Sequence, residues 1–342
     1  ETKTYHISLG KKTKNYKLEL SNDKSLLGFE YSNKIFLPDG FYLTPITDES
    51  LISIYGFYNK NIESLDFDFL ISFRVSDLEI NPGAYVFDSG NRNLFLKDDD
   101  EELILDDSGE PISLVKDREF QNFSFSFGFK KYIGKFQLNS WFMHTMRAPR
   151  VEELYSDGPH LAAYSFEIGN PNLNSEKIYG IENSIGYQSN NFDFSMVTFY
   201  NYSPYYFQMS KDGHCEIPSD WKPWTSHPCY GVDWIDWGSG GLGWLHKYSA
   251  KGHEVIIKGV EFDIGYNYKK VEIGYNYSIL HGINETLGGR PLSYMNPTKH
   301  ILDFNYFNDF FIHKLRLTKI NDQYRLGEFE TFTPGAFLID YI

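Results

Sequence analysis

Residues 146–155 read Met-Arg-Ala-Pro-Arg-Val-Glu-Glu-Leu-Tyr, and residues 166–176 read Phe-Glu-Ile-Gly-Asn-Pro-Asn-Leu-Asn-Ser-Glu, with Gly-Pro-His at 158–160 between them. An aromatic, strand-like segment precedes this stretch, and another starts near Ile178. Proline, glycine and asparagine in this density are typical of turns and loops. The stretch therefore predicts a loop that ends one strand and leads into the next.

Apolar and polar residues alternate with a period of two on both sides of this loop, which indicates β-strands. The segments 65–75 and 255–268 are longer than the roughly 5 or 6 residues of an ordinary strand, and they reach the 9 to 11 residues of a membrane strand. The alternation itself fits two protein classes. In a soluble sandwich the apolar face points inward, whereas in an outer-membrane barrel it meets lipid and the polar face lines a wet lumen.

The composition excludes some classes. The chain has 342 residues, 18% of them aromatic and mostly Tyr or Phe, and a net charge of −14. No apolar run approaches the roughly 18 to 20 residues of a membrane helix, so a helical membrane protein is excluded. The acidic balance argues against nucleic acid as a partner, because phosphates require a basic surface.

Short and long connections alternate between the predicted strands, which is the pattern of outer-membrane barrels with tight periplasmic turns and long external loops. The short ones lie at 22–25, 59–62, 131–134, 190–191, 269–270 and around Asn308, and the long ones at 34–50, 77–117, 148–177, 209–252 and 282–298.

In order and spacing, the two halves of the opening stretch resemble the barrel of TonB-dependent outer-membrane receptors. The residues that carry this resemblance are Arg147, Pro149, Glu153, Gly169, Asn170, Pro171 and Glu176, followed by the Gly259-x-Glu261 step and the segments 289–292 and 296–300. The Gly-Pro-His insert looks most like the zinc and heme-type branch of the family.

The resemblance implies an all-β, antiparallel transmembrane β-barrel in the outer membrane of a Gram-negative bacterium, with residues 1–342 as a partial barrel domain. It implies a transporter rather than an enzyme, one that imports a metal or metal chelate by energy-coupled transport. Zinc is the first candidate ligand, and heme or a siderophore comes next. Its expected partners are outer-membrane lipid, the transported metal or chelate, and a TonB complex that acts through a plug domain absent from this chain.

About 14 strand-like segments, against about 22 in a complete transporter barrel, indicate a fragment that lacks the plug and some strands. No signal peptide opens the sequence. Two rival functions remain: a passive porin-like or adhesin-like barrel, and a soluble all-β binding protein such as a secreted lectin.

The loop at 208–253 holds the only two cysteines, Cys215 and Cys229. Because exported proteins pass an oxidising compartment, we expect a disulfide between them, and a thiolate metal site is the weaker alternative. A disulfide would bring His214 and His227 together as metal ligands. Trp221, Trp224 and Trp237 are candidates for binding an apolar ligand such as a porphyrin. A solvated aromatic loop without a specific role is the alternative.

By the same resemblance, His160 and Glu167 are candidate metal ligands in the opening loop, with turn packing as the alternative for His160. For Arg147, Pro149 and Glu153 a structural role is expected, in which proline ends a strand and an ion pair fixes the base of the loop. The acidic run 98–102 is expected to be a solvated face. No nucleophile, acid and base are arranged for catalysis, and no cofactor is indicated.

Overall fold

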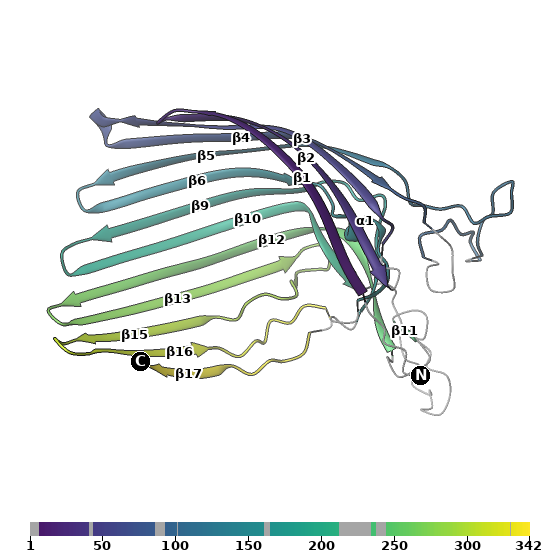
Figure 1. Cartoon of the computed structure of the whole chain (residues 1–342). Helices are drawn as coiled ribbons and strands as arrows, with labels where there is room; N and C mark the ends of the chain where they lie inside the picture. The colour runs from purple at the N-terminus through teal and green to yellow at the C-terminus, as the bar shows by residue number, and fades with distance from the viewer. Residues whose placement is uncertain are drawn as a thin grey trace, which may run out of the picture.

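A computed structural model describes residues 7–40, 44–85, 93–100, 102–160, 165–211, 234–236, 244–328 and 330–342. These residues form one mainly antiparallel sheet that curves around a central space (Figure 1). No helix in this part of the chain is long and apolar enough to cross a membrane.

Seventeen strands are described, of which four are short accessory strands and thirteen form a continuous meander. The meander consists of β1 (Ile7–Ser21), β2 (Ser25–Gly40), β3 (Thr47–Ile62), β4 (Phe67–Pro82), β5 (Arg118–Ile133), β6 (Phe136–Arg147), β9 (Glu176–Gln188), β10 (Phe192–Lys211), β12 (Trp244–Tyr268), β13 (Val271–Asn284), β15 (Lys299–Phe307), β16 (Ile312–Ile320) and β17 (Ala336–Tyr341). The accessory elements are β7 (Asp157–His160), β8 (Ser165–Ile168), β11 (Trp234–Asp236), β14 (Arg290–Pro291), the 3-10 turn η1 (Glu63–Leu65) and α1 (Val151–Tyr155). Among the described residues no pairing joins β1 to β17, so the barrel wall is open between these two strands (Figure 1).

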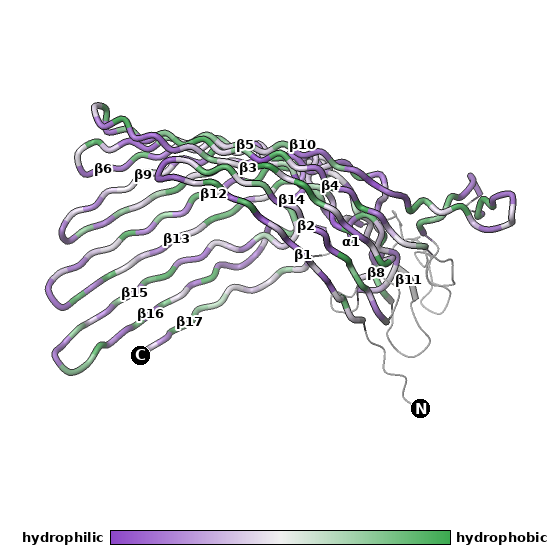
Figure 2. Tube along the Cα trace, turned by 45° about the horizontal axis from the view of Figure 1, so that its top comes forward, coloured by the Kyte–Doolittle hydropathy of each residue, from purple (hydrophilic) through white to green (hydrophobic). Residues whose placement is uncertain are grey.

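The outer face of the sheet is apolar and uncovered. Phe73 and Phe125 are paired across β4 and β5, and they are 38% and 42% exposed. Ile54 on β3 is 50% exposed beside them. Hydrophobic and hydrophilic residues are interspersed along the strands (Figure 2). Large apolar side chains exposed in rows on one sheet face are the signature of a surface that meets lipid.

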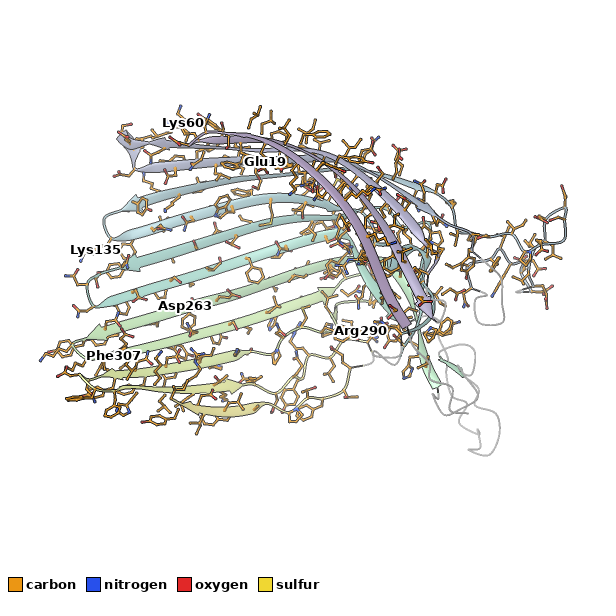
Figure 3. The ribbon with its side chains drawn as sticks, in the orientation of Figure 1. Glu19, Lys60, Lys135, Asp263, Arg290 and Phe307 are labelled. Carbon is orange, nitrogen blue, oxygen red and sulfur yellow. The ribbon has the colours of Figure 1, made fainter. Side chains whose placement is uncertain are left out.

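The inner face carries the polar partners of these rows. Arg74 of β4 donates a hydrogen bond to Glu30 of β2 at 2.6 Å and to Ser53 of β3 at 2.7 Å. Tyr55 of β3 lies under the Arg74 guanidinium and donates to Glu19 at 2.5 Å. These polar side chains lie on the face opposite the apolar rows, as the membrane-barrel prediction requires, and Figure 3 labels Glu19 among them.

Short turns gather at one end of the sheet and long connections at the other, as predicted (Figure 1). The turn expected at 59–62 was placed too early, because β3 runs to Ile62 and η1 follows it. The predicted boundaries were wrong where strands run past the apolar band. The expected loop 34–50 is mostly strand, since β2 and β3 stay paired as far as Phe36 and Thr47. There Lys34 and Glu49 form a 2.5 Å ion pair. Outside the lipid band the outer face need not be apolar, so the period-two signal disappears although the strands continue.

The connection between β4 and β5 contains a threefold repeat that the sequence reading did not recognise. Leu96, Ile104 and Ile112, spaced eight residues apart, are joined in a ring by backbone hydrogen bonds of 2.8 to 3.0 Å. Asp98 and Asp106 each accept two backbone N–H groups from the turn that follows, at 2.8 to 3.0 Å. The described part of the acidic run is solvent-exposed, as expected, and its first aspartate closes a turn.

Candidate functional site

The opening stretch folds into a helix and a hairpin, whereas the sequence predicted a loop throughout. β6 ends at Arg147, two residues before Pro149, and α1 follows at once. Glu153 caps this helix, because its Oε2 accepts the backbone N–H of Arg150 at 2.7 Å. A five-residue helix is too short to give a readable period. The glutamate at its third position, Glu153, is a sign in the sequence that could have indicated it.

α1 packs on the inner wall of the barrel. Its Val151, Leu154 and Tyr155 are buried in one cluster with side chains from five strands of the wall. Those partners are Phe36, Ile80, Phe120, Phe207 and Ala250, with Leu173 from the loop itself. The loop between β6 and β9 therefore turns into the barrel and blocks part of its long-loop end with an apolar core.

Arg147 holds the base of this inserted loop. Its guanidinium donates two hydrogen bonds to Glu153, at 2.9 and 3.1 Å, and two to Glu176 of β9, at 2.7 and 3.2 Å. It also lies 4.5 Å above the Phe207 ring. The ends of β6 and β9 and the start of α1 are thus fastened at one point, and the Arg, Pro and Glu of the motif have structural positions.

Gly169 and Asn170 fasten the other end of the loop to α1, and Pro171 fastens it to β5. A Cβ atom on Gly169 would lie 2.5 Å from the Leu154 carbonyl carbon, so only glycine fits there. The Asn170 N–H donates to the Glu153 carbonyl at 2.9 Å, and the Pro171 carbonyl accepts from Arg118 of β5. The residues of this motif lie close together because each of them contacts either α1 or a strand of the barrel wall.

Asp157 ties the same loop to the long connection after β4. It is completely buried, and its carboxylate accepts hydrogen bonds from Tyr85 and from Asn93, through the backbone N–H at 2.8 Å and the side-chain amide at 2.6 Å. Burial raises the pKa of Asp157 above its usual value. The sequence does not indicate Asp157 as a site residue, because nothing in its neighbourhood along the chain shows which distant donors will enclose it.

His160 and Glu167 come together on the β7–β8 hairpin. The His160 Nδ1 lies 2.7 Å from the Glu167 Oε1, which also accepts the Ser165 hydroxyl at 3.0 Å. β8 also pairs in parallel with β12, which places Ser165 opposite His246. His160 and His246 are exposed. Within the described ranges no three His, Cys, Asp or Glu side chains form a metal cluster.

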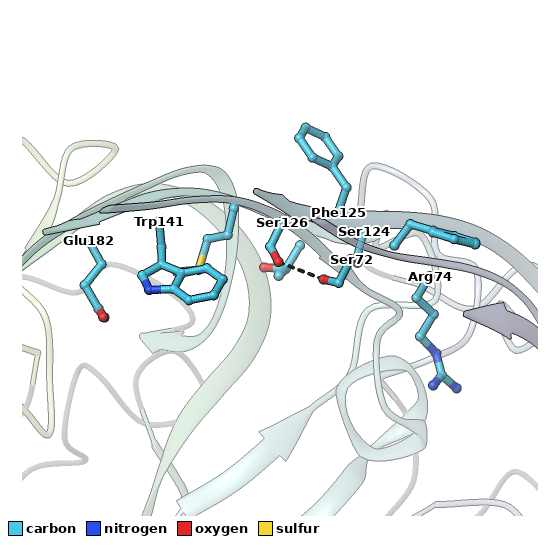
Figure 4. A pocket seen from close by; sticks show the side chains of 10 residues that line it. Ser72, Arg74, Ser124, Phe125, Ser126, Trp141 and Glu182 are labelled. Carbon is cyan, nitrogen blue, oxygen red and sulfur yellow. Dashed lines mark hydrogen bonds between the residues drawn. The ribbon is translucent and has the colours of Figure 1, made fainter. Parts of the chain in front are cut away.

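A second candidate surface lies on the inner wall. A depression of about 510 Å³ runs across β4, β5, β6 and β9. Arg74, Trp141 and Glu182 point from the sheet into the enclosed space there, and Phe125 points the opposite way (Figure 4). Ser72 and Ser126 are joined across the strands at 2.7 Å. Both charge signs and an aromatic ring are thus available to a polar occupant of the lumen.

Seven predicted site residues lie outside the described residues. They are Cys215, Cys229, His214, His227, Trp221, Trp224 and Trp237.

A family model for the TonB dependent receptor-like β-barrel matches residues 3–341. The chain belongs to this family. The fold agrees with three solved receptors. Copper transporter OprC is 11% identical, with a TM-score of 0.68 over 97% of this chain and 50% of its own. The FrpB iron transporter from Neisseria meningitidis is 11% identical, with a TM-score of 0.58 over 98% of this chain and 48% of its own. The hemophore receptor HasR of Serratia marcescens, solved with HasA and heme, is 12% identical, with a TM-score of 0.58 over 98% of this chain and 53% of its own.

The chain thus spans about half the length of the solved structures that it matches. Barrels of the TonB-dependent receptor family lie in the outer membrane of Gram-negative bacteria. In such barrels the short turns are periplasmic and the long loops are external. The inserted loop with α1, His160 and Asp157 is therefore at the external end.

Proposed function

We propose that this chain is part of the barrel of a receptor that imports a metal ion or metal chelate, with zinc as the first candidate and heme or a ferric siderophore next. Family membership supports the receptor class. The transporters of similar fold include proteins described as handling copper, iron and heme. The function is transport rather than catalysis. A plug domain that the TonB complex engages is the proposed partner that supplies energy.

The observation that carries the metal proposal is the His160–Glu167 pair at the external end. A metal-binding histidine usually donates its second ring nitrogen to a carboxylate, which fixes the ring and its tautomer. Glu167 bonds Nδ1 of His160, so Nε2 is the atom offered to a metal, and Glu167 orients the ring or adds an oxygen ligand. Imidazole and carboxylate are both ordinary zinc ligands. His246, across from Ser165, is the nearest further imidazole on the paired strand.

Growth under metal limitation tests this function. A deletion strain of the source bacterium is complemented with the full-length receptor or with its His160→Ala variant, and growth is followed under zinc, copper and iron limitation separately. We expect a zinc-limited defect that the wild type restores, and about a tenfold lower initial rate of zinc uptake for the variant. The reason is that the loss of one zinc ligand commonly weakens capture by at least this factor.

His313→Ala is the matched control, since His313 lies at the short-turn end, bonded to Tyr341. It should restore growth like the wild type. A growth defect confined to iron limitation would identify heme or a ferric siderophore, and not zinc, as the imported ligand. A defect confined to copper limitation would identify copper. The absence of any defect under all three conditions would contradict metal import.

We infer further that Cys215 and Cys229 form a disulfide that closes the external loop between β10 and β12. Support comes from their being the only cysteines of this chain, in an outer-membrane protein that matures in an oxidising compartment. Such a bridge contributes about 3 kcal/mol by restricting the unfolded chain. In the denatured full-length receptor, with any other cysteines replaced, thiol reagents should find no thiol before reduction and two after it. Two reactive thiols before reduction would contradict the bridge.

A further inference from the structure

A row of cross-strand neighbours on the inner wall carries one carboxylate between two aromatic rings. In the sheet register Glu182 of β9 lies directly across from Trp141 of β6 on one side and from Phe199 of β10 on the other. Residues directly across from each other on neighbouring strands share a face of the sheet. Because Trp141 and Glu182 point into the enclosed space (Figure 4), Phe199 lies on that face as well.

Both rings lean away from Glu182 and lie over glycines. Gly128 of β5 is the next residue in the row after Trp141, and Gly259 of β12 is the next after Phe199. A Cβ atom on Gly128 would overlap three neighbouring atoms of the six-membered ring of Trp141, so one face of this ring rests on the glycine. A Cβ atom on Gly259 would overlap two atoms of the Phe199 ring. The Glu182 carboxylate is therefore left partly exposed, with the other face of the indole beside it.

Glu182 has no cationic partner in the part of the chain that the structure describes. No basic nitrogen there lies within ion-pair distance of its carboxylate. No Lys or Arg of these residues lies over the Trp141 ring either. The adjoining depression of about 510 Å³ reaches as far as Arg74, but this charge is paired with Glu30 at 2.6 Å. A carboxylate and an aromatic face thus adjoin a space that can hold a further cation.

The same components are already combined once in this wall, on β2, β3 and β4. The Tyr55 ring lies over a glycine, Gly28. The Arg74 guanidinium lies 5.3 Å from the centre of the Tyr55 ring and donates to the Glu30 carboxylate at 2.6 Å. There a guanidinium completes a set of glycine, ring and carboxylate. Among the described residues, the row around Glu182 has the other three components without the guanidinium.

We propose that Glu182, Trp141 and Phe199 form a binding site for a guanidinium group on the inner wall. The carboxylate pairs with the charge, and the planar cation stacks on the indole face, which attracts positive charge. A metal ion is a poorer match, because one carboxylate and two hydrocarbon rings leave most of its coordination positions without ligands.

Two sources can supply this guanidinium: a small molecule that enters the barrel, or an arginine from another segment of the full-length receptor. The two arms of the experiment separate these sources. The site is distinct from the His160–Glu167 pair and needs only the membrane barrel. It can therefore fail without affecting the metal-import proposal.

The first arm measures binding of methylguanidinium to the purified full-length receptor in detergent by NMR of the probe, with uncharged methylurea of similar shape as the reference. For a free ligand, we expect methylguanidinium to bind at least fivefold more tightly than methylurea. Glu182→Gln should abolish this preference. Trp141→Leu should weaken methylguanidinium binding about twofold to fivefold, whereas Trp141→Phe, which keeps an aromatic ring, should retain most of it.

The second arm detects a guanidinium that the receptor itself supplies and that keeps the free probe out. Arginines are modified with phenylglyoxal, and the modified positions are mapped by mass spectrometry. For an internal source, one arginine should react at least fivefold faster in Glu182→Gln than in the wild type, because it has lost its carboxylate partner.

Asp193→Asn is the matched control for both arms. Asp193 is an exposed carboxylate on the same face of β10, six residues from Phe199, but its cross-strand neighbours are Gln188 and Gly265 rather than aromatic rings. This variant should behave like the wild type. Equal binding of the two probes by the wild type, together with unchanged arginine reactivity in Glu182→Gln, would overturn the proposal. A preference for methylguanidinium that survives in Glu182→Gln, or equal effects of the Glu182 and Asp193 substitutions, would also overturn it.

Discussion

Replacing Arg147 by alanine should release the inserted loop from the barrel wall and raise hydrogen exchange at residues 151–155 by about 30-fold to 150-fold. Arg147 is the only described cation paired with Glu153 and Glu176, whose side chains are 19% and 7% exposed. Its removal leaves two enclosed carboxylates close together. Breaking a buried pair in this way costs about 3 to 5 kcal/mol. Because Arg147 is 40% exposed, we expect the free energy of opening the loop to fall by about 2 to 3 kcal/mol. This loss corresponds to the 30-fold to 150-fold rise in hydrogen exchange.

Arg316→Ala is the matched control for this prediction. Arg316 also makes a two-point ion pair, with Asp303 at 2.7 and 3.1 Å, but its side chain is 55% exposed. Exposed pairs contribute about 0 to 1 kcal/mol. Exchange near residue 316 should therefore rise less than about fivefold. If Arg147→Ala changes exchange in α1 no more than Arg316→Ala changes it locally, the motif arginine does not hold the loop.

Replacing Asp157 by alanine should detach the connection between β4 and β5 from the inserted loop. Three donors, the Tyr85 hydroxyl and two groups of Asn93, would lose their acceptor in a buried place. Leaving buried donors unsatisfied costs about 1 to 3 kcal/mol each. Limited proteolysis between residues 93 and 117 should accelerate at least tenfold. Asp157→Asn should accelerate it little, because the Asn93 amide can flip to pair with the new amide.

The same residue gives a pH dependence with a definite sign. Because burial raises the pKa of Asp157 in the folded state, the folded form holds its proton more tightly than the unfolded form. The contribution of Asp157 to the stability of the docked loop is then fully present below its ordinary pKa of 3.8 and is lost as pH rises from there through the raised pKa. Asp157→Asn should remove this component. Greater protease resistance of the wild-type loop at higher pH, absent in Asp157→Asn, would contradict the assignment.

The sequence revealed the barrel because lipid imposes a simple rule on each spanning strand. Residues 123–130 read Phe-Ser-Phe-Ser-Phe-Gly-Phe-Lys, with phenylalanine at every second position. This pattern predicted both the strand and its apolar face. The ends of the strands were less predictable. Phe36 and Ile80 lie on the inner face outside the lipid band, where contacts with α1 replace contacts with solvent. A period of two does not show which polar-face positions a distant loop will cover.

The candidate site was predictable where its residues are close in sequence. The spacing of Arg147, Pro149 and Glu153 indicated a loop base, and the structure places Arg147 and Glu153 in contact there. By contrast, the approach of His246 to the β7–β8 hairpin and the enclosure of Asp157 by Tyr85 and Asn93 depend on pairings across 64 or more residues. Such contacts follow from the order of strands in the sheet, which no local pattern encodes.

The central claim is that the apolar side of this sheet faces hydrocarbon and the polar side faces a water-filled interior. Phe125 and Ser126 are neighbours on β5 with side chains on opposite faces. The most direct measurement labels Phe125→Cys and Ser126→Cys variants of the full-length receptor in bilayers with a fluorophore, and compares quenching by nitroxide lipids with quenching by a water-soluble ion. Position 125 should respond to the lipid quencher and position 126 to the ion. Equal responses, or the reverse order, would contradict the account.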